Sequence, residues 1–548
     1  MDLILNIKLL ITKVYKQGFC FLFVFSQCLL FGQSSYWIYL DAKSPMNDLG
    51  ISQRSLLQKQ TQGIVIDIKD LDIDTDKLDL IRNQGYELVA KSRWLNAVVV
   101  ASNDYPKSLE ELNFVKRINK VKQVSIPKSL AYQKSARSAS DSSYYGIAWN
   151  QIKMLNGHLL HQAGYRGEDI NIGVFDNGFV NMDSIVGFDS LFMEDRVKYQ
   201  WDYINNDSLV FDGGSHGTAV MSTMAALWPD SMVGTAPKAN YFLFHTENDA
   251  SETLQEEYNW VVAAEKADSL GVQVMNTSLG YTTMDDDRDS HTYDDMDGNT
   301  TAITIAADIA ASKGMLVISS AGNSGMDDWY YISAPADGDS VLAIGAVDGN
   351  GDLASFSSRG PSADGRVKPN VVAQGRESAI LNINGDLSFS NGTSFSGPIT
   401  AGLAACLWQA HPDKSNMEVF KAIEQSADQY LNPDDDYGYG LPDFWKAHLI
   451  LADSIEADTL VTHAGLEPEI WYNNPINGAL NFSVGSSSLE QSTISCYNVA
   501  GQLLYSEDRL LYNGINKVEI DARHFDASSF LIIRIATSSA TKTIKVIR

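Results

Sequence analysis

The middle of the chain, from residue 146 to about 455, alternates short apolar runs with segments of helical periodicity. The runs at 170–175 and 341–347 are mainly apolar, which is typical of strands buried on both faces of a sheet. Longer stretches such as 260–269 and 301–313 have the character of helices. This alternation predicts an α/β domain in which helices cover a parallel sheet.

A smaller unit precedes this domain. Within residues 33–135, the runs 36–40 and 95–100 have the composition of strands, and a helix start is followed by apolar residues at helical spacing over 108–115. This pattern predicts a small α+β unit. An unrelated α/β adaptor domain stays open as an alternative.

A third unit follows the central domain. Residues 466–548 contain strand-like runs, including 492–497 and 530–535, that are separated by Gly and Asn turns. They predict a β-sandwich and contain no catalytic constellation. With 548 residues in total, the chain is long enough for such a multidomain organisation.

The first 32 residues have the features of an export signal. Three lysines precede an apolar run at 19–31, and Gly32 is small enough to lie before a cleaved bond. The run is shorter than a membrane-spanning helix requires. A lipoprotein site at Cys28 is the alternative, although the residues before it lack the usual small side chains.

Charge is distributed unevenly. The formal net charge is −27, and residues 136–465 carry 47 acidic and 16 basic side chains. This excess argues against nucleic-acid binding and favours a solvated acidic surface, with bound cations as the alternative. The polar stretch at 123–145 is typical of an exposed linker, which is either a processing site or an uncleaved loop.

Only two cysteines, Cys406 and Cys496, lie outside the signal segment. Because they fall in separate predicted domains, we expect no disulfide between them. Cys406 lies in an apolar helical stretch, which predicts a buried structural thiol and not a nucleophile.

Three residues form a candidate catalytic group. Ser394, in the segment 391–398, opens a largely apolar helix whose free backbone N–H groups could stabilise negative charge. His216 follows a glycine pair and could act as a general base. Asp176 ends an apolar strand, where the active sites of α/β proteins gather. Taken singly, each residue also fits a structural role: a helix cap, a packing histidine and a turn aspartate.

The order Asp176, His216, Ser394, with these flanking sequences, resembles the subtilisin-like serine protease (subtilase) family. The resemblance implies a secreted endopeptidase that forms an acyl-enzyme on Ser394, with His216 as base and Asp176 orienting it. It places Asn323 in the oxyanion hole. The substrate-binding residues that it implies are Ser278, Leu279, Gly280 and Gly322, which would pair with an extended peptide.

Three residues depart from the pattern of the family. Asn177 stands where Thr or Ser usually follows the catalytic Asp, and Phe395 and Ser396 stand where Met and Ala usually follow the nucleophile. None of these changes removes a catalytic group. They leave the shape of the substrate pocket and the rate open.

The same resemblance assigns 33–135 as an inhibitory propeptide and 136–455 as the peptidase domain. No cofactor is expected to be required for the chemistry. The acidic loop 285–298 could hold structural calcium, but Tyr293 occupies the first ligand position of an EF-hand pattern, so a solvated loop is favoured.

The tail resembles the C-terminal sorting domain of proteins exported by the type IX secretion machinery. The segments that carry the resemblance are 473–475, 497–503 and the basic end 542–548, whereas Ser529 and Leu531 depart from it. The resemblance implies export through the periplasm to the cell surface or the medium. An accessory β-sandwich that binds carbohydrate or protein is the alternative.

The sequence therefore predicts a protease that acts on proteins or peptides. The alternative from another class is a catalytically inactive, subtilisin-like surface binding protein. Retention of all four catalytic residue types in fitting contexts argues against it.

Overall fold

The computed structural model describes residues 34–44, 47–121 and 144–452, together with seven strand segments between 469 and 547. The expected signal segment 1–32 and nearly all of the linker, 122–143, lie outside the described residues. So do the tail motif 473–475 and Ser529. Within the described part of the chain, no helix is both long and apolar enough to cross a membrane.

A seven-stranded parallel sheet forms the centre of the molecule, in the order β13-β12-β11-β10-β5-β9-β6. This confirms the α/β prediction, and β12 coincides with the run expected at 341–347. The strands are β5 (Asn171–Asp176), β6 (Val197–Asp202), β9 (Asn240–His245), β10 (Val274–Thr277), β11 (Leu316–Ser320), β12 (Val341–Val347) and β13 (Val371–Gln374).

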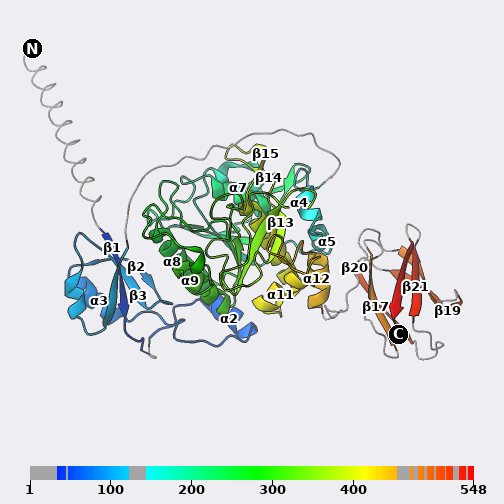
Figure 1. Ribbon diagram of the computed structural model, residues 1–548, viewed down its shortest axis with the longest axis horizontal. Helices are drawn as coiled ribbons and strands as arrows, with labels where there is room; N and C mark the ends of the chain where they lie inside the picture. Colours follow the sequence, from blue (N-terminus) through cyan, green and yellow to red (C-terminus); the bar gives the residue numbers. More distant parts are fainter. Residues whose placement is uncertain are drawn as a thin grey trace, which may run out of the picture.

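Different helices cover the two faces of this sheet (Figure 1). The strand β5 shows how the sequence achieves this, because its side chains alternate between the faces. Val174 joins one core, while the ring of Phe175 stacks on Phe244 and lies 5.4 Å from that of Trp260 in the other. On the first face lie α7 (His216–Ala225) and α10 (Thr393–Ala410), and on the second α8 (Leu254–Leu270) and α9 (Ala302–Ser312).

Shorter elements surround this centre. The helices are α4 (Trp149–Lys153), α5 (Gly157–Gln162), α6 (Asp189–Met193), α11 (Asn416–Ser426) and α12 (Phe444–Leu451). The 3-10 helices are η2 (Met182–Ser184), η3 (Val186–Phe188) and η4 (Tyr293–Asp295). Two small hairpins pair β7 (Leu227–Trp228) with β8 (Met232–Val233) and β14 (Ser378–Leu381) with β15 (Leu387–Ser390).

The order of the sheet reverses at β5, whose neighbours β9 and β10 lie on opposite sides of it. In open parallel sheets such a reversal creates a crevice at the carboxyl ends of the strands. Asp176 is the last residue of β5, Ser278 follows β10, and Asn323 lies three residues after β11. The fold therefore brings residues from distant parts of the sequence to one edge.

The N-terminal unit is a four-stranded antiparallel sheet in the order β2-β3-β1-β4, with α3 packed on one face. Its other face lies on α8, where the ring centroids of Trp37 and Tyr258 are 5.1 Å apart. The elements are β1 (Ser34–Leu40), α2 (Gln53–Thr61), α3 (Thr75–Asn83), β2 (Glu87–Ser92), β3 (Ala97–Ser102), η1 (Lys107–Glu111) and β4 (Val115–Val121).

The helix expected at 108–115 is wrong in its second half. A single 3-10 turn ends at Glu111, and β4 begins at Val115, which pairs with Leu40 of β1. Leu109 and Phe114 are both buried in the core of this unit. Tertiary pairing with the sheet thus overrides the local helical spacing.

The C-terminal region contains two antiparallel sheets, β16-β17-β20 and β19-β18-β21-β22. Side chains of both sheets, including Val484 and Ile494, share one core, as expected for a β-sandwich. The strands are β16 (Glu469–Tyr472), β17 (Ala479–Ser486), β18 (Glu490–Asn498), β19 (Leu503–Leu511), β20 (Gly514–Asp521), β21 (Phe530–Thr537) and β22 (Thr541–Ile547).

The two cysteines behave as predicted. Cys496 lies in the core of the C-terminal region and Cys406 in that of the central domain, and both are free and buried. Burial raises the pKa of the Cys406 thiol well above its usual value, which keeps the thiol protonated and unreactive.

Candidate active site

A buried carboxylate and an imidazole face each other at the end of β5. Asp176 is 2% exposed, and its Oδ1 lies 2.8 Å from Nδ1 of His216, the first residue of α7. The backbone N–H of Asn177 donates to the same oxygen at 2.9 Å. The structure thus brings together two residues that are 40 positions apart in the sequence. In the sequence, only the motifs around each of them indicated that they act together.

Two opposing effects act on the His216 imidazole. Burial favours its neutral form and lowers the pKa, but the negative charge of Asp176 and the hydrogen bond to it outweigh burial and raise the pKa above its usual value. The contact on Nδ1 directs the other ring nitrogen, Nε2, away from Asp176. This is the arrangement of an imidazole prepared to accept a proton at Nε2.

Asn177 departs from the family pattern and has a structural role that the sequence did not indicate. Its Oδ1 accepts hydrogen bonds from the backbone N–H groups of His216 at 3.1 Å and Gly217 at 3.4 Å, at the start of α7. Its Nδ2 donates to Asp249 at 2.5 Å. Asn177 therefore caps the helix that carries His216 and fixes it to the end of β5.

Ser394 lies at the opposite side of the crevice as the second residue of α10, behind the glycine cap Gly392. Its Oγ donates to the carbonyl of Ser278 at 3.3 Å, and Ser278 Oγ donates in return to the Ser394 carbonyl at 3.1 Å. This reciprocal pair joins the end of β10 to the start of α10.

The ring of Phe395, the residue after Ser394, lies 5.9 Å from the His216 ring, so the nucleophile candidate and the imidazole share one site. No hydrogen bond joins Ser394 Oγ to His216 in the described residues. Such bonds are often loose without substrate and tighten when it binds.

Asn323 lies beside the same helix start. Its Oδ1 accepts hydrogen bonds from the backbone N–H of Thr393 at 2.8 Å and from the Thr393 hydroxyl at 3.1 Å. Because the oxygen is held in this way, the Nδ2 donors point elsewhere on an exposed side chain. A Cβ built on Gly392 would lie 3.7 Å from this Nδ2, which places the amide against the backbone beside Ser394.

The residues predicted to bind substrate follow the carboxyl ends of β10 and β11. Ser278 is buried, whereas Leu279 and Gly280 are partly or fully exposed. Gly322 has a φ of +111° and donates its backbone N–H to Thr393 Oγ1 at 3.2 Å. Of the four predicted positions, Ser278 and Gly322 therefore contact the start of α10 directly.

Ser333 is a residue of this site that the sequence did not indicate. A Cβ added to Gly280 would overlap its Oγ, and one added to Gly322 would lie 3.1 Å from it. Ser333 is 6% exposed, and its Oγ has no hydrogen-bond partner among the described residues. No sequence motif indicates this position, because Ser333 meets Gly280 and Gly322 only when the chain is folded.

A cluster of carboxylates lies on the loop and helix start after β9. One ligand atom each of Glu247, Glu252 and Glu256 lies within 4.8 Å of the others. Burial and the charge of the neighbouring Glu256 raise the pKa of Glu252 to about 8. Burial likewise raises the pKa of Glu256 to about 7. In the sequence, the acidic residues that suggested cation binding lie in the loop 285–298, and no local pattern indicated this cluster.

In that predicted loop, protein groups already contact two of the carboxylates. Asp286 pairs with Arg288, and Asp295 accepts hydrogen bonds from the backbone and hydroxyl of Thr292. Calcium binding by this loop stays a prediction.

Comparison with known proteins agrees with this geometry. The model of the Subtilase family matches residues 61–440. Subtilisin E of Bacillus subtilis (strain 168) is 29% identical over 369 residues, which are 67% of this chain and 84% of that protein. Subtilisin of Bacillus pumilus is 31% identical over 300 residues, which are 54% of this chain and 95% of that protein.

We expect the charge of Asp176 to control the titration of His216. Replacing Asp176→Asn removes the effect that raises the His216 pKa and leaves burial, so the pKa should fall. NMR titration of the imidazole protons measures it. The exposed Asp183→Asn variant is the matched control and should leave the titration unchanged. An unaltered His216 pKa in Asp176→Asn would contradict the interpretation of this pair.

Proposed function

Because the chain belongs to the subtilase family and is a serine endopeptidase, we propose that it hydrolyses peptide bonds through an acyl-enzyme on Ser394. His216 serves as the general base, Asp176 orients it, and Asn323 belongs to the oxyanion hole. The observation that carries the proposal is the convergence of these four side chains at the carboxyl edge of one sheet.

In the first step, Ser394 Oγ attacks the substrate carbonyl and its proton passes to His216 Nε2. The Asp176 carboxylate, 2.8 Å from Nδ1, holds the ring in the required tautomer and stabilises the imidazolium without taking the proton. The imidazolium then gives its proton to the leaving amine, which departs poorly unless protonated. Water repeats the sequence on the acyl-enzyme to release the second product.

The negative charge of the tetrahedral intermediate needs donors that are already in place. Asn323 Nδ2 is one, because Thr393 fixes the opposite end of the amide. The backbone N–H of Ser394 is another, since the first turn of a helix leaves donors without partners inside the helix. The N–H groups of Thr393 and Phe395 on either side of it already donate to Asn323 and Gly392.

The peptide would bind in extended form along Ser278, Leu279 and Gly280 and pair through its main chain. Gly280 and Gly322 allow the unpaired Ser333 hydroxyl to approach this strand closely. The peptidase chemistry proposed here uses protein groups alone, and structural calcium stays a prediction.

An inactive binding protein of this shape would usually have lost at least one catalytic group. Asp176, His216, Ser394 and Asn323 are all retained, and the Asp176–His216 hydrogen bond is formed. The proposal therefore favours the enzyme.

Labelling with a fluorophosphonate probe tests the nucleophile. We expect the protein, once its N-terminal unit has been cut off and removed, to be labelled stoichiometrically and to cleave casein. Ser394→Ala should abolish both activities because the probe reacts with an activated serine. Ser312→Ala, an exposed serine at the end of α9, is the matched control and should behave as wild type. Labelling that survives in Ser394→Ala would refute the assignment.

A second prediction concerns Asn323. Replacement by Ala should lower kcat by about 10²–10³-fold, with KM little changed, because the lost donor acts on charge that develops in the transition state. Asn323→Asp keeps the acceptor for Thr393 but removes the donor, so it should also lose activity. Asn299→Ala, at an exposed position, controls for general effects. An unchanged kcat in Asn323→Ala would contradict the oxyanion-hole role.

We also propose that residues 33–135 act as an inhibitory propeptide of a zymogen, as the resemblance to the family implies. The β-sheet of this unit and the peptidase domain are in direct contact through Trp37 and Tyr258. Cleavage of a peptide bond within the linker would make the N-terminal unit and the peptidase domain two separate chains. The catalytic roles proposed above do not depend on this maturation step.

For localisation, we propose a signal peptide over 1–32 and a type IX sorting domain over 466–548, which together would export the enzyme through the periplasm. The support is the motif resemblance and the two antiparallel sheets that share a core in the C-terminal region. Release into the medium and attachment to the cell surface are both compatible with this export route.

Fusion of residues 466–548 to a periplasmic reporter tests the sorting role. In a bacterium with a type IX secretion system, the reporter should appear outside the outer membrane, as measured by protease accessibility in intact cells. The same fusion without 541–548, which removes β22, is the control and should stay in the periplasm. Periplasmic retention of the complete fusion would contradict the proposal.

A further inference from the structure

The loop between β9 and α8, residues 246–253, contacts the residues that hold His216. At its start, the backbone N–H of Thr246 donates to the Asp176 carbonyl at 3.0 Å and extends the pairing of β9 with β5. Further along, the Asp249 carboxylate accepts a hydrogen bond from Asn177 Nδ2 at 2.5 Å. The loop therefore meets both the residue that pairs with the imidazole and the residue that caps its helix.

The Asn177 amide is held at both of its ends. Its Oδ1 accepts from the backbone N–H groups of His216 and Gly217, while its Nδ2 donates to Asp249. Rotation of the amide by 180° would point its NH2 group at two N–H donors and its oxygen at a carboxylate. Asp249 thus favours the one orientation in which Asn177 caps α7.

The Asn177 side chain also packs on the turn before His216. Its backbone carbonyl accepts from the N–H of Gly214 at 2.8 Å. A Cβ added to Gly214 would lie 2.5 Å from Cγ of Asn177, so the glycine permits this close contact. A displacement of the Asn177 side chain is therefore transmitted to the segment that carries the imidazole.

The turn that presents Asp249 is fixed from the other side by Glu256 of α8, which is 2% exposed. Glu256 Oε1 accepts from the backbone N–H of Asn248 at 3.3 Å and from the Ser251 hydroxyl at 3.1 Å. Its Oε2 accepts from the backbone N–H of Thr253 at 2.7 Å, in the capping box that begins α8. Asp249 is exposed, but the backbone on either side of it is held to a buried residue.

Asp249 also acts on the imidazole through its charge. Burial lowers the pKa of His216, whereas the charge of Asp176 and, to a smaller extent, that of Asp249 raise it. Because Asp249 is exposed, water and dissolved ions weaken its electrostatic effect. Its hydrogen bond to Asn177 is therefore the main contact through which it reaches His216.

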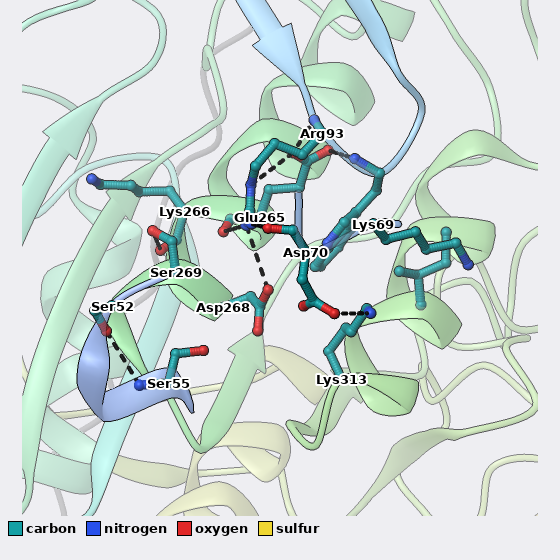
Figure 2. Close-up of polar contacts among 12 residues, drawn as sticks. Ser52, Ser55, Lys69, Asp70, Arg93, Glu265, Lys266, Asp268, Ser269 and Lys313 are labelled. Atoms are coloured by element: carbon teal, nitrogen blue, oxygen red, sulfur yellow. Dashed lines mark hydrogen bonds and ion pairs between the residues drawn. The ribbon is translucent and has the colours of Figure 1, made fainter. Parts of the chain in front are cut away.

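Asp249 is remote from the ion pairs that join the N-terminal unit to α8. Arg93 reaches Asp268 at 3.4 Å near the C-terminal end of this helix (Figure 2). The loop that carries Asp249 lies at the opposite end, and a helix of this length, rising 1.5 Å per residue, spans about 25 Å. Substitution of Asp249 should therefore leave those ion pairs unchanged.

We infer that Asp249 is a positioning residue for the peptidase reaction: through Asn177 it fixes the start of α7, and with it the His216 imidazole, at the end of β5. This inference rests on the proposed role of His216 as general base. The contacts run from Glu256 of α8 through the turn at Asp249 to Asn177 and α7. Asp249 acts through Asn177 and is not itself a catalytic residue.

The start of α7 determines how His216 Nε2 meets Ser394. No hydrogen bond joins Ser394 Oγ to His216 in the part of the chain that the structure describes, so the two groups must come together when substrate binds. Small errors in the placement of such groups reduce the rate of the chemical step. Loss of Asp249 should therefore lower kcat more than it affects substrate binding.

The first test replaces Asp249→Ala in the protein prepared as for probe labelling. We expect kcat on a peptide substrate to fall about tenfold with KM little changed, because the imidazole is less well placed while the peptide-binding segment is intact. Asp183→Ala, at an exposed position in η2, is the matched control and should behave as wild type. An unchanged kcat in Asp249→Ala would overturn the inference.

Asp249→Asn separates the hydrogen bond from the charge. The new amide oxygen can still accept from Asn177, so kcat should remain closer to wild type than that of Asp249→Ala. Loss of the charge should lower the His216 pKa and shift the acid limb of kcat/KM to lower pH, since the base must be neutral. A loss of kcat in Asp249→Asn as large as in Asp249→Ala would overturn the role of the hydrogen bond.

A double-variant cycle tests whether Asp249 acts through Asn177. The kcat of Asn177→Ala combined with Asp249→Ala should be higher than the product of the two single losses predicts, because both changes break one contact. Circular dichroism checks that each protein is folded. Strictly multiplicative losses in folded proteins would overturn the inference.

Failure of the peptidase function gives a different result from failure of this inference. If the wild type cleaves no peptide, the proposed function fails, and NMR titration of His216 still examines the contact. The His216 pKa should then be lower in Asp249→Asn than in wild type. If the wild type is active but none of the Asp249 variants changes kcat, only the role of Asp249 is refuted.

Discussion

The contact between the buried Asp176 carboxylate and His216 Nδ1 determines how the rest of the site must be arranged. A carboxylate that is 2% exposed needs partners, and here it has one backbone N–H and one imidazole. The chain must therefore return from β6 to the end of β5 before α7 can begin. Asn177 stabilises that return, because it follows Asp176 in the chain and its side chain caps the start of α7. The sheet then places Ser394 and Asn323 across the same crevice.

The sequence predicted the parts of this site that local patterns report. Asp176, His216, Ser394 and Asn323 lie in short motifs with characteristic neighbours, and the apolar run at 341–347 coincides with β12. Parallel strands that are buried on both faces leave such a strong signal because nearly every residue must be apolar. The catalytic roles themselves stay predictions that the proposed variants address.

Other features depend on contacts that sequence patterns do not report. Ser333 meets Gly280 and Gly322 only because separate loops converge. The apolar spacing over 108–115 fits a helix, yet the helical turn ends at Glu111 and Val115 pairs with Leu40 of β1. The helix α2 is mostly polar, so its sequence does not indicate that it is packed against other elements. The partners of its Lys59, Asp268 and Lys313, lie more than 200 residues away.

The net charge of the central domain at neutral pH is less negative than its count of acidic and basic residues gives. Glu247, Glu252 and Glu256 lie close together, and burial raises the pKa of each. The charge of Glu256 adds to the rise at Glu247 and Glu252, and that of Asp285 at Glu256. Such groups retain protons near neutral pH, so that a count of carboxylates overstates the negative charge. The excess of acidic residues thus describes the outer surface better than the interior.

The strand order of the central sheet has a kinetic consequence. β5 pairs with β10, about a hundred residues further along the chain, whereas β2 and β3 of the N-terminal unit are separated by only a few residues. Non-local pairs must overcome loop-closure entropy before they gain any stabilisation, which slows their formation. The N-terminal unit also leaves the ribosome first. The β2-β3 hairpin can therefore form early and offer α8 apolar side chains such as Val99 while the strands of the peptidase domain are still unpaired.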